Sequence, residues 1–70
     1  MLTNKQATEE VKKIMPFIAM MADKKGLNWD YGYLIAEDKW EVTFFTDEGK
    51  TIEYYKEPTT NKLLEKLLSK

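Results

Sequence analysis

The segment from residue 28 to residue 56 reads NWDYGYLIAEDKWEVTFFTDEGKTIEYYK, and its aromatic and β-branched residues recur with a period of two. That period is typical of β-strands, in which successive side chains point to opposite faces of the sheet. Two acidic groups, Glu37-Asp38 and Asp47-Glu48-Gly49, interrupt the pattern where turns are expected. The segment therefore predicts three antiparallel strands joined by two hairpins.

The second hairpin has a turn whose chemistry sets a register. Gly49 suits the left-handed position of a three-residue hairpin loop with a bulge, and such a loop pairs Thr46 with Lys50. Counting back from this loop gives the next pairs on the same face, which are Phe44 with Ile52 and Val42 with Tyr54.

The first hairpin is expected to turn at Glu37-Asp38, with Ala36 opposite Lys39. Its further pairs are then Ile35 with Trp40, Tyr33 with Val42, and Tyr31 with Phe44. Both turns place the large residues on one face, and a one-residue slip would turn the whole set to solvent. That predicted face contains Trp29, Tyr31, Tyr33, Ile35, Trp40, Val42, Phe44, Ile52 and Tyr54.

The opposite face of the predicted sheet is mostly polar, as is usual for an antiparallel sheet with one solvated side. Leu34, Phe45 and Tyr55 are the exceptions. In this register Glu41 and Glu53 are diagonal neighbours on the same face, beside Phe45 and Tyr55. We therefore treat these five residues as a candidate contact patch for a partner.

A helical period precedes the strands. Thr3 and Gln6 have the spacing of a capping box, and Lys24-Lys25-Gly26 is a typical helix end. The apolar stripe between these signals consists of Ala7, Val11, Ile14, Ile18 and Met21. Pro16 interrupts it, so we expect a helix kinked at Pro16 or two short helices that meet there.

Residues 15–22 carry no charge, so this part of the helix is apolar around its whole circumference. One interpretation is a helix sunk into the core. The other is a half-exposed contact surface that includes Met15, Phe17 and Met20, because methionine side chains adapt readily to a partner. The sequence leaves both interpretations open.

The last helix is expected after Pro58, with a threonine of the pair Thr59-Thr60 as its N-cap. Its apolar stripe consists of Leu63, Leu64, Leu67 and Leu68. The predicted fold is therefore a single α+β domain over residues 1–70. Its element order is α-β-β-β-α, a three-stranded antiparallel meander with both helices packed on the aromatic face.

Composition argues against several classes of chemistry. The chain has no cysteine and no histidine, and its only serine is Ser69, so the usual zinc ligands and nucleophilic triads are missing. Its three glycines lie far apart and form no phosphate-binding motif. We therefore expect a protein that is not an enzyme and that holds neither a metal nor another cofactor.

The charge balance, with 11 basic and 12 acidic residues, argues against bulk attraction to nucleic acid or to an anionic membrane. The chain has neither an apolar run long enough to span a bilayer nor a signal-peptide pattern, so a cytoplasmic location is expected. All 11 basic residues are lysine. This bias is typical of low-GC genomes, so a bacterium of that kind or its phage is the expected source.

These observations favour a small protein-binding module with an accessory, regulatory or inhibitor-like role. Its partner would be another protein, contacted by the patch around Phe45 and by residues 15–22. Self-association is a related possibility, in which a homodimer covers Met15, Phe17, Met20 and the open sheet face.

The alternative function is nucleic-acid binding, by stacking of bases on Trp29, Tyr31 and Tyr33. The predicted element order is similar to that of the double-stranded-RNA-binding domain, in topology only. At the positions that correspond to that family's basic helix start and first hairpin loop stand residues 58–62, PTTNK, and residues 36–39, AEDK. The first offers one lysine and the second is acidic, so the resemblance implies no binding residue here.

Overall fold

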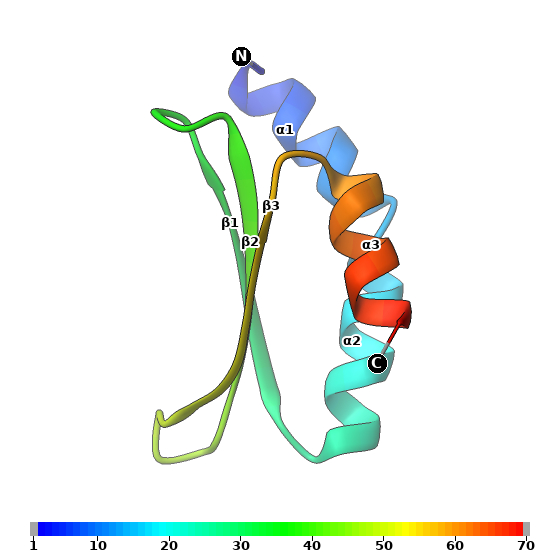
Figure 1. The fold of residues 1–70 in the computed structure, drawn as a ribbon, viewed down its shortest axis with the longest axis vertical. Helices are drawn as coiled ribbons and strands as arrows, with labels where there is room; N and C mark the ends of the chain where they lie inside the picture. Colours follow the sequence, from blue (N-terminus) through cyan, green and yellow to red (C-terminus); the bar gives the residue numbers. More distant parts are fainter. Residues whose placement is uncertain (1, 70) are drawn as a thin grey trace.

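The computed structural model describes residues 2–69. Within this range the strands form one antiparallel sheet in the order β1-β2-β3, and all helices lie on one side of it (Figure 1). The elements are α1 (Asn4–Lys12), α2 (Met15–Lys25), β1 (Asn28–Leu34), β2 (Lys39–Phe45), β3 (Thr51–Glu57) and α3 (Thr60–Leu68). The predicted α+β class and meander topology are confirmed.

The N-terminal helical segment is divided at residues 13–14, so two short helices meet just before Pro16. Pro16 lies in the first turn of α2, where the missing N–H would have no partner inside the helix anyway. The capping box of Thr3 and Gln6 is present at the start of α1. Gly26 ends α2 in the left-handed conformation, with φ of 68°.

The register between β1 and β2 differs from the predicted one by two residues. Tyr33 lies opposite Trp40, and Leu34 opposite Lys39, because the turn is a four-residue loop with Asp38 at φ of 53°. A shift of two keeps every strand residue on its predicted face. Ile35 is the exception, because it leaves the sheet for the loop, where it is 49% exposed.

The register between β2 and β3 was predicted correctly only next to the turn. The amide of Thr46 donates to Lys50 as expected, and Gly49 has φ of 88°. A bulge then follows, because Phe45 pairs with Thr51 whereas Phe44 pairs with Glu53. From Glu53 onward, each side chain of β3 therefore points to the face opposite to the predicted one.

The bulge exchanges the two tyrosines of β3. Tyr55, which was expected on the open face, lies opposite Val42 and is 7% exposed. Ile52 and Tyr54, which were expected on the aromatic face, are 48% and 51% exposed. The ring of Tyr55 meets that of Phe44 edge-on, with 6.2 Å between centroids.

The core lies between the helices and the aromatic face of the sheet. Its most buried members come from every layer: Val11, Ile18, Val42, Phe44, Leu63 and Leu67 are each at most 1% exposed. Trp29 and Tyr33 pack against this cluster and are partly buried. Both helical regions therefore use the sheet face that the sequence predicted, and the other face stays open (Figure 1).

Candidate interaction surface on the helix layer

The side chains of α2 separate into two groups. Ile18 and Ala22 are four residues apart, on one side of the helix, and both are buried in the core. Phe17 and Met20 are three residues apart on another side, and they are 42% and 47% exposed. Residues 15–22 are therefore a half-exposed surface, as in the second interpretation of the sequence. Met15, also a candidate there, is partly buried and packs against the core.

The neighbouring helix α3 contributes further apolar side chains. Leu63 and Leu67 face the core and are buried, whereas Leu68 is 59% exposed. Leu64 is partly buried and packs beside the core. The apolar stripe of α3 is therefore wider than the part of the helix that packs on the sheet. Leu68, at the edge of this stripe, lies on the surface.

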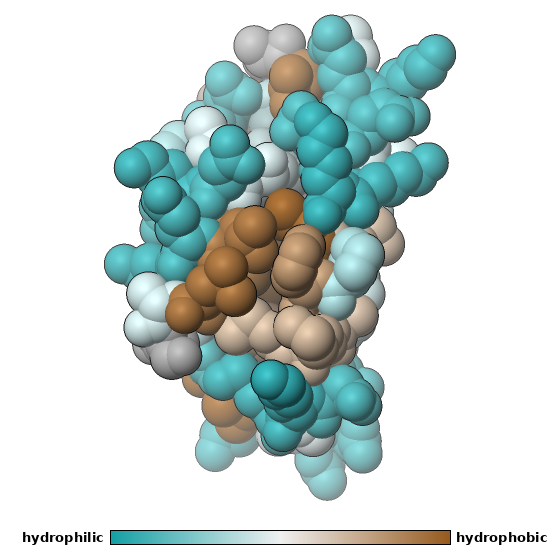
Figure 2. Space-filling view, turned by 90° about the vertical axis from the view of Figure 1, so that its right-hand side faces the viewer, coloured by the Kyte–Doolittle hydropathy of each residue, from teal (hydrophilic) through white to brown (hydrophobic). Residues whose placement is uncertain are grey.

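We call the exposed and partly buried apolar residues of these two helices the helix-face patch: Phe17, Met20 and Met21 of α2, and Leu64 and Leu68 of α3. A shallow pocket of about 310 Å³ lies between the two helices and is lined by Met20, Met21, Lys24, Lys25, Leu67 and Leu68. Figure 2 shows apolar atoms across the middle of the helix layer, with hydrophilic side chains above and below them.

At one end of the patch, Lys25 pairs with Glu53 of β3, with 2.7 Å between Nζ and Oε2. The hydroxyl of Tyr55 also donates to Glu53. Glu53 therefore lies on the helix side of the sheet and not on the open face. The expected neighbourhood of Glu41 and Glu53 was wrong, because the bulge in β3 places them on opposite faces.

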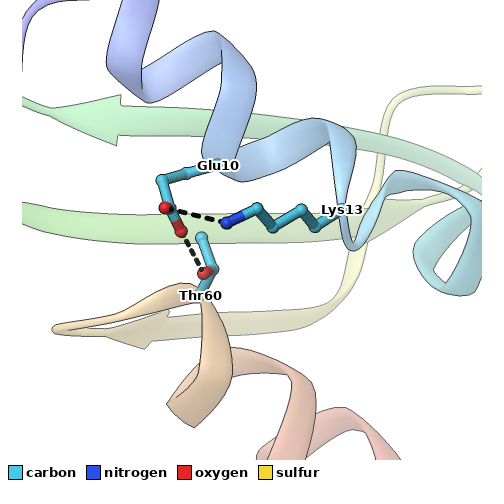
Figure 3. Close-up of polar contacts among 3 residues, drawn as sticks. All are labelled: Glu10, Lys13 and Thr60. Carbon is cyan, nitrogen blue, oxygen red and sulfur yellow. Dashed lines mark hydrogen bonds and ion pairs between the residues drawn. The ribbon is translucent and has the colours of Figure 1, made fainter.

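At the other end, Glu10 of α1 joins the N-terminus of α3 (Figure 3). Its carboxylate accepts hydrogen bonds from Lys13 Nζ at 3.2 Å and from Thr60 Oγ1 at 3.1 Å. These two bonds, the one from Lys13 first, hold the pKa of Glu10 below its usual value. The contact fixes α1 against α3 and thereby helps to hold the helix layer together.

The open sheet face does not assemble the contact patch expected from the sequence. Tyr55 is absent from it, and Leu34 and Phe45 lie at opposite ends of the sheet, since Leu34 pairs with Lys39 and Phe45 with Thr51. Lys39 and Phe45 are the two ends of β2, six residue steps apart, which is about 20 Å at 3.3 Å per residue. Both candidates are only partly exposed.

Polar contacts occupy the centre of the open face instead. The hydroxyl of Tyr54 donates to Glu41 Oε2 at 2.7 Å, and Lys56 pairs with Glu37 at 2.5 Å. The bond to Glu41 is the main reason that the pKa of Tyr54 is raised. These contacts, with Ile52 and Tyr54 of β3 at 48% and 51% exposed, give a mixed polar and apolar sheet surface.

The aromatic residues considered for base stacking face the helix layer. Trp29 stacks on Tyr31 with 6.1 Å between ring centroids, and Tyr33 lies 4.7 Å from Trp40. Because Trp29 and Tyr33 also pack on the core, their faces are largely used inside the protein. Of the three, Tyr31 has the largest exposure.

No group of three or more His, Cys, Asp or Glu residues that could hold a metal ion occurs within residues 2–69. Over the same range no helix is both long and apolar enough to cross a membrane. Comparison with known proteins finds no matching family model, no matching curated protein and no matching solved structure. The geometry of the surface is therefore the basis for a functional proposal.

Proposed function

We propose that this chain is a small protein-binding module, accessory or regulatory in role and cytoplasmic, that holds its partner on the helix-face patch. One observation carries the proposal. Phe17, Met20 and Leu68 expose large apolar side chains on two adjacent helices, and no other part of residues 2–69 covers them. Single exposed apolar residues are normal on protein surfaces, but Met20 and Leu68 line one pocket between α2 and α3, and Phe17 lies three positions before Met20 on α2.

The energetics favour a contact at this place. Full burial of a side chain such as Phe, Met or Leu contributes about 1.5–3 kcal/mol, and roughly half of that is still available for these half-exposed residues. Aromatic and methionine side chains are frequent anchors of interfaces. The shallow pocket between α2 and α3 can receive one apolar side chain of a partner, as grooves between helices do for amphipathic helices.

The first test is affinity capture from the cells that encode the chain, followed by titration with the captured protein. Met20→Lys places a charge in the patch, and we expect the dissociation constant to rise at least tenfold. Ile52→Lys is the matched control, because Ile52 is 48% exposed and Met20 47%, yet Ile52 lies on β3. We expect this control to bind like the wild type.

Two results would contradict the proposal. Equal binding of the partner by Met20→Lys and by the wild type would show that the contact does not lie on the helix layer. Capture of no protein, with the wild type remaining monomeric, would leave the patch without an occupant. Capture of a second copy that Met20→Lys abolishes would instead identify the self-association expected as a related possibility.

A further inference from the structure

The sheet has two edge strands within residues 2–69, β1 and β3, and they are protected very differently. On β3 a bulge interrupts the ladder, Lys56 is exposed, and Pro58 follows the last residue of the strand. Bulges, lysines and prolines are the usual devices that prevent edge strands from pairing with another chain. The edge of β3 is therefore blocked.

The edge of β1 has none of these devices. Its seven residues, NWDYGYL, contain no lysine, no proline and one charged residue, Asp30. The pairing of β1 with β2 runs from Asn28 to Leu34 without a register shift. An edge that is regular, nearly uncharged and rich in aromatic residues is a template for a further strand.

The outward main-chain groups of β1 can be assigned. The amide of Tyr31 donates to the carboxylate of its neighbour Asp30 at 2.8 Å. Amides that point inward are engaged by β2, so we assign the Tyr31 amide to the outer edge, together with those of Trp29 and Tyr33 two residues away on either side. An added strand would use these donors, and the Tyr31 amide would exchange its bond to Asp30 for one to the new strand.

The surface beside this edge is also suited to a contact. Tyr31 is 39% exposed and Ile35 49% exposed. Both line a pocket of about 210 Å³ that opens between α1 and β1, together with Ala7 and Thr8. Side chains from an added strand would therefore find apolar neighbours on the helix side of the sheet.

We propose that β1 pairs antiparallel with β1 of a second copy, with Tyr31 on the two-fold axis. The sequence of the strand fits this arrangement. Trp29 then lies opposite the partner's Tyr33, and the two Tyr31 rings are neighbours. Such aromatic pairs stabilise neighbouring strands. Asp30 lies opposite the partner's Gly32, so no side chain stands directly against it, although the carboxylate of Glu41 lies beside Gly32.

This homodimer is independent of the helix-face patch, because the two surfaces lie on different elements. Sedimentation over a concentration series measures it, starting from a monomer of 8.3 kDa. We expect the wild type to reach twice that mass, and Tyr31→Lys to raise the dimer dissociation constant at least tenfold. Tyr54→Lys, at a tyrosine of the blocked edge that is 51% exposed against 39% for Tyr31, should dimerise like the wild type, as should Met20→Lys.

A disulfide provides a second test of the register. The chain has no cysteine, so the double variant Asn28→Cys/Leu34→Cys offers only the two residues that the proposed register places opposite each other. Oxidation at dilute concentration should give a covalent dimer. A wild type that stays monomeric, equal dimerisation of Tyr31→Lys and wild type with unchanged circular dichroism, or no covalent dimer would each overturn the pairing. An unrelated extended peptide that binds β1 while the chain stays monomeric would also overturn it.

Discussion

Tyr55 connects the sheet to the helix layer through one side chain. Its ring is buried against Phe44, and its hydroxyl donates to Glu53, which in turn pairs with Lys25 of α2. Burial is the main cause that raises the pKa of Tyr55 to about 12, and the bond to Glu53 adds to it. The neutral phenol is therefore the form that the folded state requires.

This environment predicts a loss of stability at alkaline pH. The folded state keeps the Tyr55 proton that the unfolded chain releases near pH 10, so the contribution is complete below pH 10 and is lost as the pH rises to about 12. The upper limit of the loss is about 2.7 kcal/mol, and solvent screening reduces it. Urea unfolding at pH 9 to 12 should show a shallower decline for Tyr55→Phe; parallel curves would contradict the assignment.

Glu10 predicts the opposite pH dependence. Because its pKa is lowered in the folded state, its contribution is present above the usual carboxyl pKa and is lost as the pH falls through the folded value. We expect Glu10→Gln to lower the urea midpoint at pH 7, and the difference from wild type to vanish in acid. Glu9→Gln, at the exposed neighbouring position, should match the wild type at both pH values.

At the scale of the elements, the sequence predicted helix ends well because they depend on single residues. Thr3, Gln6, Gly26 and Thr59 act where their local chemistry indicates. The faces of β1 and β2 were also predicted correctly. The face of β3 was not, because Tyr54 and Tyr55 are adjacent and either could fill the core. The bulge at Ile52 places Tyr55 in the core and Tyr54 at the surface. No residue of the turn predicts this bulge.

The register of β3 is testable with paired substitutions. Tyr55→Ala removes a buried ring and should destabilise the fold by about 3 kcal/mol, in line with other truncations of buried aromatic residues. Tyr54→Ala removes an exposed ring from the adjacent position and should cost less than about 1 kcal/mol. Chemical denaturation of both variants checks this. A larger loss of stability in Tyr54→Ala than in Tyr55→Ala would favour the register without the bulge.

At the scale of the whole molecule, one sheet face is covered and the other is not. Because the helices form an outer layer on the covered face, only some residues of the helix-face patch could be predicted from the sequence. The sequence identified Phe17 and Met20 as candidate contact residues because residues 15–22 carry no charge, and a helix packed on a sheet cannot bury its whole circumference. Leu68 was assigned to the core stripe, since only the packing of α3 beside α2 shows that its position lies beyond the core.

A comparison of two phenylalanines separates the core from the surface. Phe44 is fully buried and Phe17 is 42% exposed. Phe44→Ala should cost about 3–5 kcal/mol, much of the total for a domain with about 0.05–0.15 kcal/mol per residue. Phe17→Ala should change stability by less than about 1 kcal/mol. Thermal unfolding measures both, and a large loss in Phe17→Ala would place that residue in the core.

The bond between Glu10 and Thr60 spans 50 positions of the chain, and it has a consequence for the order in which the molecule opens. Helix α1 has nine residues, and helices shorter than about 12 residues are marginal in water when isolated. It therefore keeps its structure only while docked. We expect α1 to be the last element to dock and the first to detach, so that native-state amide exchange is faster in α1 than in β2. Equal protection of the two elements would show instead that the chain opens only as a single cooperative unit.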